Sequence, residues 1–137
     1  MAETKVIQSD LKAARRLEEQ VLVEVARNGY DEAATFAIKL ALEEGLNNAI
    51  RHGNAGDPSK TVRLETDIDP RRAVIVITDE GGGFDPQTVP DPCADENLEK
   101  PSGRGIMLMQ AYMDEVHYNQ AGNQLRIVKR NAREQRP

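Results

Sequence analysis

Tryptophan is absent from the 137-residue sequence, and only one cysteine and two phenylalanines are present. The core must therefore be built from valine, isoleucine, leucine, methionine and alanine. The single cysteine, Cys93, cannot form an internal disulfide, and no cluster of cysteine and histidine residues offers a set of zinc ligands. The lack of both kinds of cross-link fits a reducing, cytoplasmic setting.

Long apolar runs and an excess of positive charge are also missing. The longest all-apolar stretch, residues 73–77, is far shorter than a membrane span, and the N-terminal segment has no apolar signal core. The formal net charge of −5 argues against a nucleic-acid binder that is held by phosphate contacts. We therefore expect neither a membrane nor a nucleic acid as a partner, and we expect proteins or small molecules instead.

The length is typical of a single domain, which we assign to residues 1–130, followed by a flexible basic tail at residues 131–137. Periodicity and turn residues predict a strand at residues 4–8, a helix between a cap at Ser9 and a stop at Asn28-Gly29, a helix at 32–52, strands at 61–68 and 73–78, a helix at 105–113, and strands at 115–119 and 124–129. Because residues 73–78 are apolar on both faces, we place that strand in the centre of the sheet. The order of elements indicates an α+β fold, with a mixed, mostly antiparallel sheet and helices packed on one face.

The stretch VITDEGGGFDP, residues 76–86, places three consecutive glycines directly after an apolar strand. One interpretation is a tight turn, because glycine adopts positive φ without steric cost and Asp85-Pro86 continues the turn signal. The other interpretation is a backbone that lies close against a ligand, with Asp79 supplying one directed polar contact. This stretch alone leaves both interpretations open.

The second helix has an apolar stripe that should face the sheet, formed by Ile38, Leu42, Gly45, Leu46 and Ala49. Glu43, Asn47 and Arg51 fall on the far side, as a solvated line. Glu44 and Asn48 lie together beside the stripe, four residues apart and next to small alanines. Either these two side chains hydrogen-bond to each other at the helix edge, or a protein partner, a ligand, water or a metal satisfies Glu44.

Two glycines flank an arginine where PSGRGIMLM begins a helix, at Gly103, Arg104 and Gly105. Free N–H groups at a helix N-terminus, glycines that permit close approach and one cation together suit a phosphate group. The usual phosphate motifs are absent, since the sequence has no G-x-x-x-x-G-K-[ST], no glycine-rich loop followed by V-A-I-K and no H-R-D loop. A chain of this kind would bind ATP by another route.

Taken in order, E-x-x-x-N on a helix, D-x-G-x-G after a strand, a lid-like loop and G-x-G opening a helix resemble the Bergerat ATP-binding fold of the GHKL superfamily, a two-layer α/β sandwich. Within it, the stretches EGLNNAIRHG, VITDEGGGFDP and SGRGIMLMQAYMDEVHY look most like the bacterial anti-sigma-factor serine/threonine kinases, or switch kinases. The resemblance covers residues 4–129.

The resemblance implies roles for residues of the first two motifs. Asp79 would accept a hydrogen bond from the adenine amino group, with Gly81 and Gly83 close to the base. Asn48 would ligate a Mg²⁺ ion that bridges the phosphates, and Glu44 would orient or deprotonate the attacking hydroxyl.

The third motif would hold the phosphates at its helix N-terminus, through Gly103, Arg104 and Gly105, and Lys100 in the lid would contact the γ-phosphate. Two features depart from the family pattern. Many members have G-T-x-V where this chain has GNQL at residues 122–125, so a threonine contact is not expected. The loop at residues 87–102 is also rich in proline and acidic residues.

The resemblance implies a Mg·ATP-dependent serine/threonine-protein kinase that acts as an anti-sigma regulatory factor. It would phosphorylate a serine of a STAS-type antagonist protein, hold a sigma factor inactive and form a homodimer. An alternative is a nucleotide-gated protein-binding module without kinase turnover. The histidines are given structural roles: His52 lies at a helix C-terminus, where its charge is favourable, and His117 lies on a strand.

Overall fold

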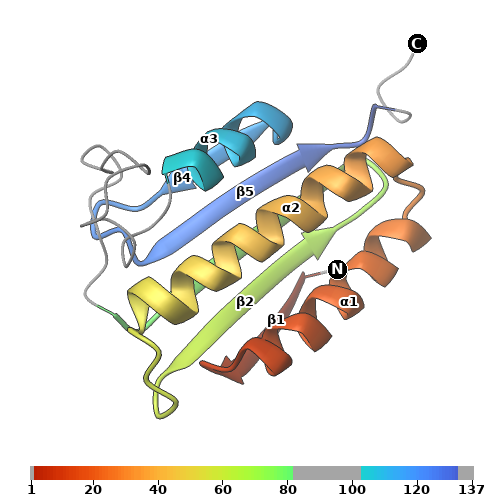
Figure 1. Ribbon diagram of the computed structural model, residues 1–137. Coiled ribbons are helices and arrows are strands. Elements are labelled where there is room, and N and C mark those ends of the chain that lie inside the picture. The colour runs from red at the N-terminus through yellow and green to blue at the C-terminus, as the bar shows by residue number, and fades with distance from the viewer. Residues whose placement is uncertain (1, 82–102, 133–137) are drawn as a thin grey trace.

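The structure is a computed structural model that describes residues 2–81 and 103–132, apart from the side chains of residues 103–106 (Figure 1). Its elements are β1 (Ala2–Gln8), α1 (Leu11–Arg27), α2 (Glu32–Asn48), a π-helical turn η1 (Ala49–Gly53), β2 (Thr61–Ile68), β3 (Arg72–Asp79), α3 (Gly103–Tyr112), β4 (Glu115–Tyr118) and β5 (Gln124–Arg130). The predicted elements are all present, with ends that differ by one or two residues at most places.

The five strands form one sheet in the order β1-β2-β3-β5-β4. The prediction that β3 is central is confirmed, because β3 pairs with both β2 and β5. Each of the four pairings is antiparallel, so the sheet lacks the parallel pair that a mixed sheet would need. The reason is the pair of helices between β1 and β2, which returns the chain to the end where β1 finished, whereas a single crossover helix would give a parallel pair.

The three helices cover one face of the sheet, which confirms the predicted two-layer α+β arrangement (Figure 1). Helix α2 lies over the middle of the sheet, and the predicted stripe faces it: Ile38 and Leu42 are fully buried and Leu46 is nearly so. Gly45 lets the helix approach closely, since an added Cβ would lie 2.7 Å from Ile77 and 2.9 Å from Leu125. Helix α2, which carries the E-x-x-x-N motif, is therefore packed tightly against β3, which leads into the D-x-G-x-G motif.

The N-terminal cap of α1 is Asp10 rather than the predicted Ser9. The Asp10 carboxylate accepts a hydrogen bond from the Lys12 backbone N–H at 3.1 Å. Ser9 is instead buried, and its hydroxyl accepts a hydrogen bond from Asn54 Nδ2 at 2.6 Å. Both residues suit a cap, and the distant contact with Asn54 decides between them.

The chain also differs from the prediction near its end. Asn131 was assigned to the tail, yet it is 2% exposed and its backbone N–H donates to the Arg71 carbonyl at 2.8 Å. Residues 133–137 of the predicted tail lie outside the described residues. Among the helices within residues 2–81 and 103–132, none is both long and apolar enough to cross a lipid bilayer.

Candidate functional site

Three polar side chains meet where α2, β3 and β4 end. Asn48 is the last residue of α2, Asp79 the last of β3 and Tyr118 the last of β4. All three line one small hollow, whose other walls come from Gly45, Ala49, Ile77, Gly122, Asn123, Gln124 and Leu125. The first two motifs, which are separate in the sequence, are thus brought together by the packing of α2 on β3.

Asp79 is 9% exposed and is held from two sides. Its Oδ1 accepts a hydrogen bond from the Gly81 N–H at 2.8 Å, and its own backbone N–H donates to the Asn123 carbonyl at 2.9 Å. Burial raises the pKa of Asp79 above its ordinary value, and the hydrogen bond from Gly81 offsets part of the rise. The carboxylate is therefore fixed in position before any ligand arrives.

The first glycine of the run is explained by a close backbone contact. A Cβ on Gly81 would overlap the carbonyl oxygen of Gly53, and a Cβ on Gly53 would overlap the Asp79 carboxylate. Gly81 does not have positive φ, so a turn conformation is not what requires glycine there. Neither earlier interpretation foresaw this, because the close neighbour belongs to the protein itself. Gly83 lies outside the described residues.

Asn48 is 7% exposed, and its amide nitrogen Nδ2 makes no hydrogen bond of standard geometry among the described residues, although the Asn48 side chain lies close enough to the Tyr118 hydroxyl to lower its pKa. The hydrogen bond with Glu44 that the sequence left open is not formed between these two residues. Buried amide groups usually have a partner, and one without is costly. A bound ligand would satisfy this amide, and because an amide can turn over, either its nitrogen or its oxygen can face that ligand.

Glu44 lies half-buried one helical turn before Asn48. Burial, and then the neighbouring Glu43 carboxylate, raise the pKa of Glu44 above its ordinary value. A carboxylate whose pKa is raised is a better proton acceptor, and such groups are frequent at catalytic sites.

Tyr118 was assigned no role from the sequence, but the structure places it in the wall of the hollow. The pKa of the Tyr118 hydroxyl is raised to about 12: burial is the largest cause, a hydrogen bond with the Asn48 side chain opposes it, and the charges of Glu44 and Asp79 add to it. These effects require all four groups to be close together. The Tyr118 hydroxyl therefore stays protonated at neutral pH and can donate or accept a hydrogen bond. The available signal was the period of β4, which turns Val116 and Tyr118 to the helix side.

Asn54, which the sequence placed in an ordinary loop, holds the site together. Its side chain is fully buried and makes three hydrogen bonds. Nδ2 donates to Ser9 Oγ at 2.6 Å and to the Thr61 carbonyl at 2.9 Å, and Oδ1 accepts from the Glu80 N–H at 2.8 Å. It thereby joins the start of α1, the start of β2 and the segment that follows Asp79.

The third motif is described only in its backbone. Helix α3 begins at Gly103, so Gly103, Arg104 and Gly105 form its first turn. Free N–H groups are expected at this position, as the sequence predicted. Lys100 lies outside the described residues, as does Cys93.

The hollow is small. Its volume is about 10 Å³, which is room for about one water molecule. A nucleotide base is much larger, so it can enter only when a wall of the hollow moves. The described residues contain no group of three histidine, cysteine, aspartate or glutamate side chains that could hold a metal ion. A Mg²⁺ ion with Asn48 as a single protein ligand would fit, provided that phosphates and water supply its other ligands, which is how nucleotide sites bind it.

The predicted structural roles of the histidines agree with the structure. His52 is half-buried in the turn η1 that ends the second helix. The exposed His117 lies on β4, with Nε2 3.5 Å from Glu115 Oε1.

Comparison with known proteins supports the same fold. The chain is 36% identical over 81 residues to an anti-sigma F factor of Halalkalibacterium halodurans, which covers 58% of this chain and 56% of that protein. It is 29% identical over 114 residues to the serine-protein kinase RsbW of Bacillus subtilis, covering 76% of this chain and 69% of that protein. The match therefore spans little more than half of the anti-sigma F factor.

A solved structure agrees in fold. The RsbU and RsbW domains of a Mycobacterium tuberculosis protein superpose with a TM-score of 0.64 at 16% identity, over 96% of this chain and 32% of that one. The family description "Histidine kinase-like ATPase domain" matches residues 7–129. The resemblance inferred from three short motifs is therefore confirmed, and this chain belongs to the histidine kinase-like ATPase domain family.

Proposed function

We propose that this chain binds Mg·ATP and transfers the γ-phosphoryl group to a serine or threonine of a partner protein, as an anti-sigma regulatory factor. The observation that carries the proposal is that Asn48 and Asp79 line one hollow with Tyr118, that Glu44 lies close to Tyr118, and that the Asn48 amide nitrogen is buried without a hydrogen bond of standard geometry among the described residues. The names of the similar proteins, an anti-sigma F factor and a serine-protein kinase, support the same role.

Asp79 is suited to recognise adenine. Its carboxylate is already oriented by the Gly81 N–H, so it can accept a hydrogen bond from the adenine amino group at little cost in side-chain entropy. Gly81, and Gly83 after it, would lie beside the base. Because the hollow has room for only about one water molecule, binding of the base would have to widen it.

Asn48 would hold the metal through its amide oxygen. When bound, Mg²⁺ would neutralise charge on the phosphates and orient them for transfer. The first turn of α3, with Gly103, Arg104 and Gly105, would supply N–H donors to the phosphates, and Lys100 would contact the γ-phosphate.

Glu44 would act on the nucleophile. The hydroxyl oxygen of the target serine would form a bond to the γ-phosphorus, the bond from phosphorus to the bridging oxygen of ADP would break, and the hydroxyl proton would pass to the Glu44 carboxylate. The raised pKa of Glu44 favours this acceptance. Positioning and electrostatics supply most of the rate in phosphoryl transfer, so this short set of groups is sufficient.

The partners follow from the same proposal. The phosphorylated protein would be a STAS-type antagonist, and a sigma factor would be the second protein bound. We also propose a homodimer in the cytoplasm, with residues 1–130 as one kinase domain.

Calorimetric titration with ATP and with ADP, each with and without Mg²⁺, tests the site. We expect ATP binding that strengthens with Mg²⁺ in the parent chain, and an Asn48→Ala variant in which Mg²⁺ no longer strengthens it. Asp79→Asn should weaken binding of both nucleotides, because the adenine contact is common to them. Absence of binding to a sample shown to be folded would overturn the proposal.

A transfer assay separates a kinase from a nucleotide-gated binding module. Radiolabelled ATP is incubated with this chain and a STAS-type protein that carries a serine. We expect label on the STAS-type protein with the parent and none with Glu44→Gln. ATP binding without transfer to any STAS-type partner would favour the binding module instead.

A further inference from the structure

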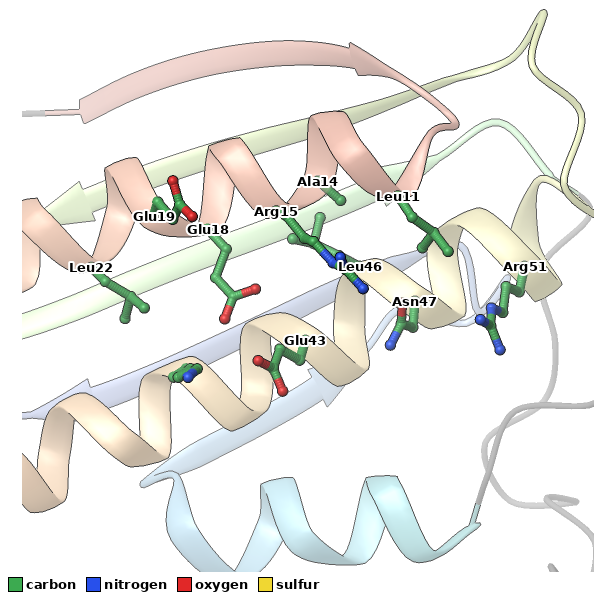
Figure 2. A pocket seen from close by; sticks show the side chains of 11 residues that line it. Leu11, Ala14, Arg15, Glu18, Glu19, Leu22, Glu43, Leu46, Asn47 and Arg51 are labelled. Carbon is green, nitrogen blue, oxygen red and sulfur yellow. The ribbon is translucent and has the colours of Figure 1, made fainter.

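A groove of about 480 Å³ lies between α1 and α2, away from the hollow at the end of α2 (Figure 2). Its volume is in the range of sites for small organic molecules, roughly 300–1,000 Å³. Two carboxylic acids face each other across it, Glu18 from α1 and Glu43 from α2, as Figure 2 shows. Neither residue has a role in the proposed kinase site.

Glu18 is buried in an unusual way for a charged residue. It is 8% exposed, its side chain forms a hydrogen bond with the Glu43 carboxyl, and no ion pair with it is found among the described residues. Because the Glu43 carboxyl is a group of the same kind, this hydrogen bond exists only while one of the two carboxyls holds a proton. An ionised carboxylate without a counter-ion is costly to bury, so a cation in the groove would stabilise this pair.

The groove contains basic residues of its own, but none of them is seen in an ion pair with Glu18 or Glu43 among the described contacts. Arg15, Lys39 and Arg51 line the same groove. Lys39 is near enough to lower the pKa of Glu18. Glu19, also on α1, adds a further negative charge near the pair.

Part of the groove wall is apolar, although charged and polar side chains also line it. Leu11 and Leu22 from α1 and Leu46 from α2 lie around the two acids (Figure 2). A long side chain with a charged end suits this arrangement, because its methylene groups can lie on the leucines while its end reaches the carboxylates. A guanidinium group offers several N–H donors in a plane and can bond to both acids at once.

We propose that the groove between α1 and α2 is a docking site for an arginine side chain presented by a segment of a partner protein. The guanidinium group lies between the carboxylates of Glu18 and Glu43, and neighbouring apolar side chains of the segment rest on the leucines. A metal ion fits less well, because the described residues offer only these two carboxylates at the centre and no group of three metal-binding side chains.

Docking of this kind depends on pH in a definite direction. Burial, a hydrogen bond with Glu43 and the charges of Glu43 and Glu19 raise the pKa of Glu18 to about 7, and Lys39 opposes the rise. The guanidinium binds the ionised pair. Affinity should therefore increase as the pH rises through about 7, with release of a proton on binding. Arg15 and Arg51 also face the groove.

The test is an NMR titration of the isotope-labelled full chain without nucleotide. The probe is a short helical peptide with one arginine flanked by leucines, and its control is the same peptide with citrulline, a neutral group of nearly the same shape. We expect saturable shifts at residues of α1 and α2 that line the groove, and at least tenfold weaker binding of the citrulline peptide. Glu18→Gln and Glu43→Gln should each weaken the arginine peptide about tenfold, whereas Glu19→Gln should change it less than twofold.

Equal binding of the two peptides, shifts confined to other surfaces, or unchanged affinity in Glu18→Gln would each overturn the proposal. The amide spectrum of every variant reports directly on folding, so a lost fold cannot be mistaken for lost docking. Because no ATP or Mg²⁺ is present, failure here leaves the proposed nucleotide site untouched, and failure of that site leaves this test valid.

Discussion

Helix α2 carries the same pair of residue types twice, Glu43 with Asn47 and Glu44 with Asn48, and the two pairs face different surroundings. Glu44 and Asn48 turn toward the ends of β3 and β4, where Asn48 is 7% exposed. Glu43 and Asn47 are exposed and turn toward α1, where they line the groove. Adjacent residues on a helix point in different directions, so Glu44 and Asn48 lie in a buried polar cluster while Glu43 and Asn47 lie on an open surface.

The difference teaches that the same residue types acquire their chemistry from what packs against them. Burial is the main cause of the raised pKa of Glu44, and Glu43 is a smaller one. Glu44 and Asn48 come close to Asp79 because Gly45 lets α2 pack closely on Ile77, near the end of β3.

The largest effect should come from removing the carboxylate on the buried side. Glu44→Gln keeps the size of the side chain but cannot accept a proton, so we expect phosphoryl transfer to fall about 10²–10⁴-fold. ATP affinity should change little, since Glu44 acts on the nucleophile. Single-turnover transfer and calorimetric titration measure the two quantities. Glu32→Gln, an exposed change on the same helix, should leave both near the parent values. Equal loss of transfer and of binding in a folded Glu44→Gln would contradict the assignment.

The second prediction concerns the close contact between Gly81 and the Gly53 carbonyl beside Asp79. Gly81→Ala should reduce the free energy of unfolding by about 3 kcal/mol, because its Cβ would overlap a backbone carbonyl that cannot rotate away. Gly29→Ala is the matched control: Gly29 has φ of 82° and nothing within 4 Å, so only backbone strain of about 1 kcal/mol applies. Chemical denaturation measures both. Similar losses in the two variants would show that the contact with Gly53 does not matter.

Much of this arrangement was predictable from the sequence. The alternation of β2, the apolar β3 and the stripe on α2 are local patterns, and each appears in the structure where it was expected. The wheel also separated Glu44 from Glu43 correctly. These predictions hold because periodicity indicates which face of a helix or strand is buried, and the buried face determines how that element packs on the sheet.

The parts that were missed depend on contacts between residues far apart in the sequence. Ser9 and Asp10 are equally good caps, and only the hydrogen bond from Asn54 distinguishes them. Asn54 itself reads as a loop residue, because nothing local shows that it binds Ser9, Thr61 and Glu80. The two helices between β1 and β2 were predicted, but the pairing of the strands depends on how these helices pack together, and a mixed sheet was expected where all four pairings are antiparallel.

A third prediction concerns Asn54, whose buried side chain joins three segments of the chain next to Asp79 by hydrogen bonds. Asn54→Ala should lower the free energy of unfolding by about 2 kcal/mol, because the Ser9 hydroxyl and the Glu80 N–H lose a buried partner. Asn119 provides the control, since its side chain also makes several hydrogen bonds but on an exposed turn where water can replace them. Asn119→Ala should therefore cost less than about 1 kcal/mol. Equal costs in urea denaturation would mean that burial of Asn54 adds nothing.

The smallest effect lies on the open side, at the acid pair of the groove. The pKa of Glu18 is raised from 4.5 to about 7 in the folded protein, so the folded state binds more protons than the unfolded state between these values. Stability supplied by the protonated pair is therefore present below about pH 4.5 and is lost as the pH rises to about 7. Glu18→Gln cannot ionise, so it should match the parent at low pH and exceed it by about 1–2 kcal/mol at about pH 8, after discounting for relaxation and solvent around the charge.

Denaturation of both proteins across this pH range measures the difference. Glu19→Gln removes only the smallest of the causes that raise the pKa of Glu18, so it should show much less of the difference. A Glu18→Gln variant that follows the parent at every pH would mean that Glu18 ionises normally. The two sides of α2 would then differ in burial alone, and the open side would hold no charge that needs a partner.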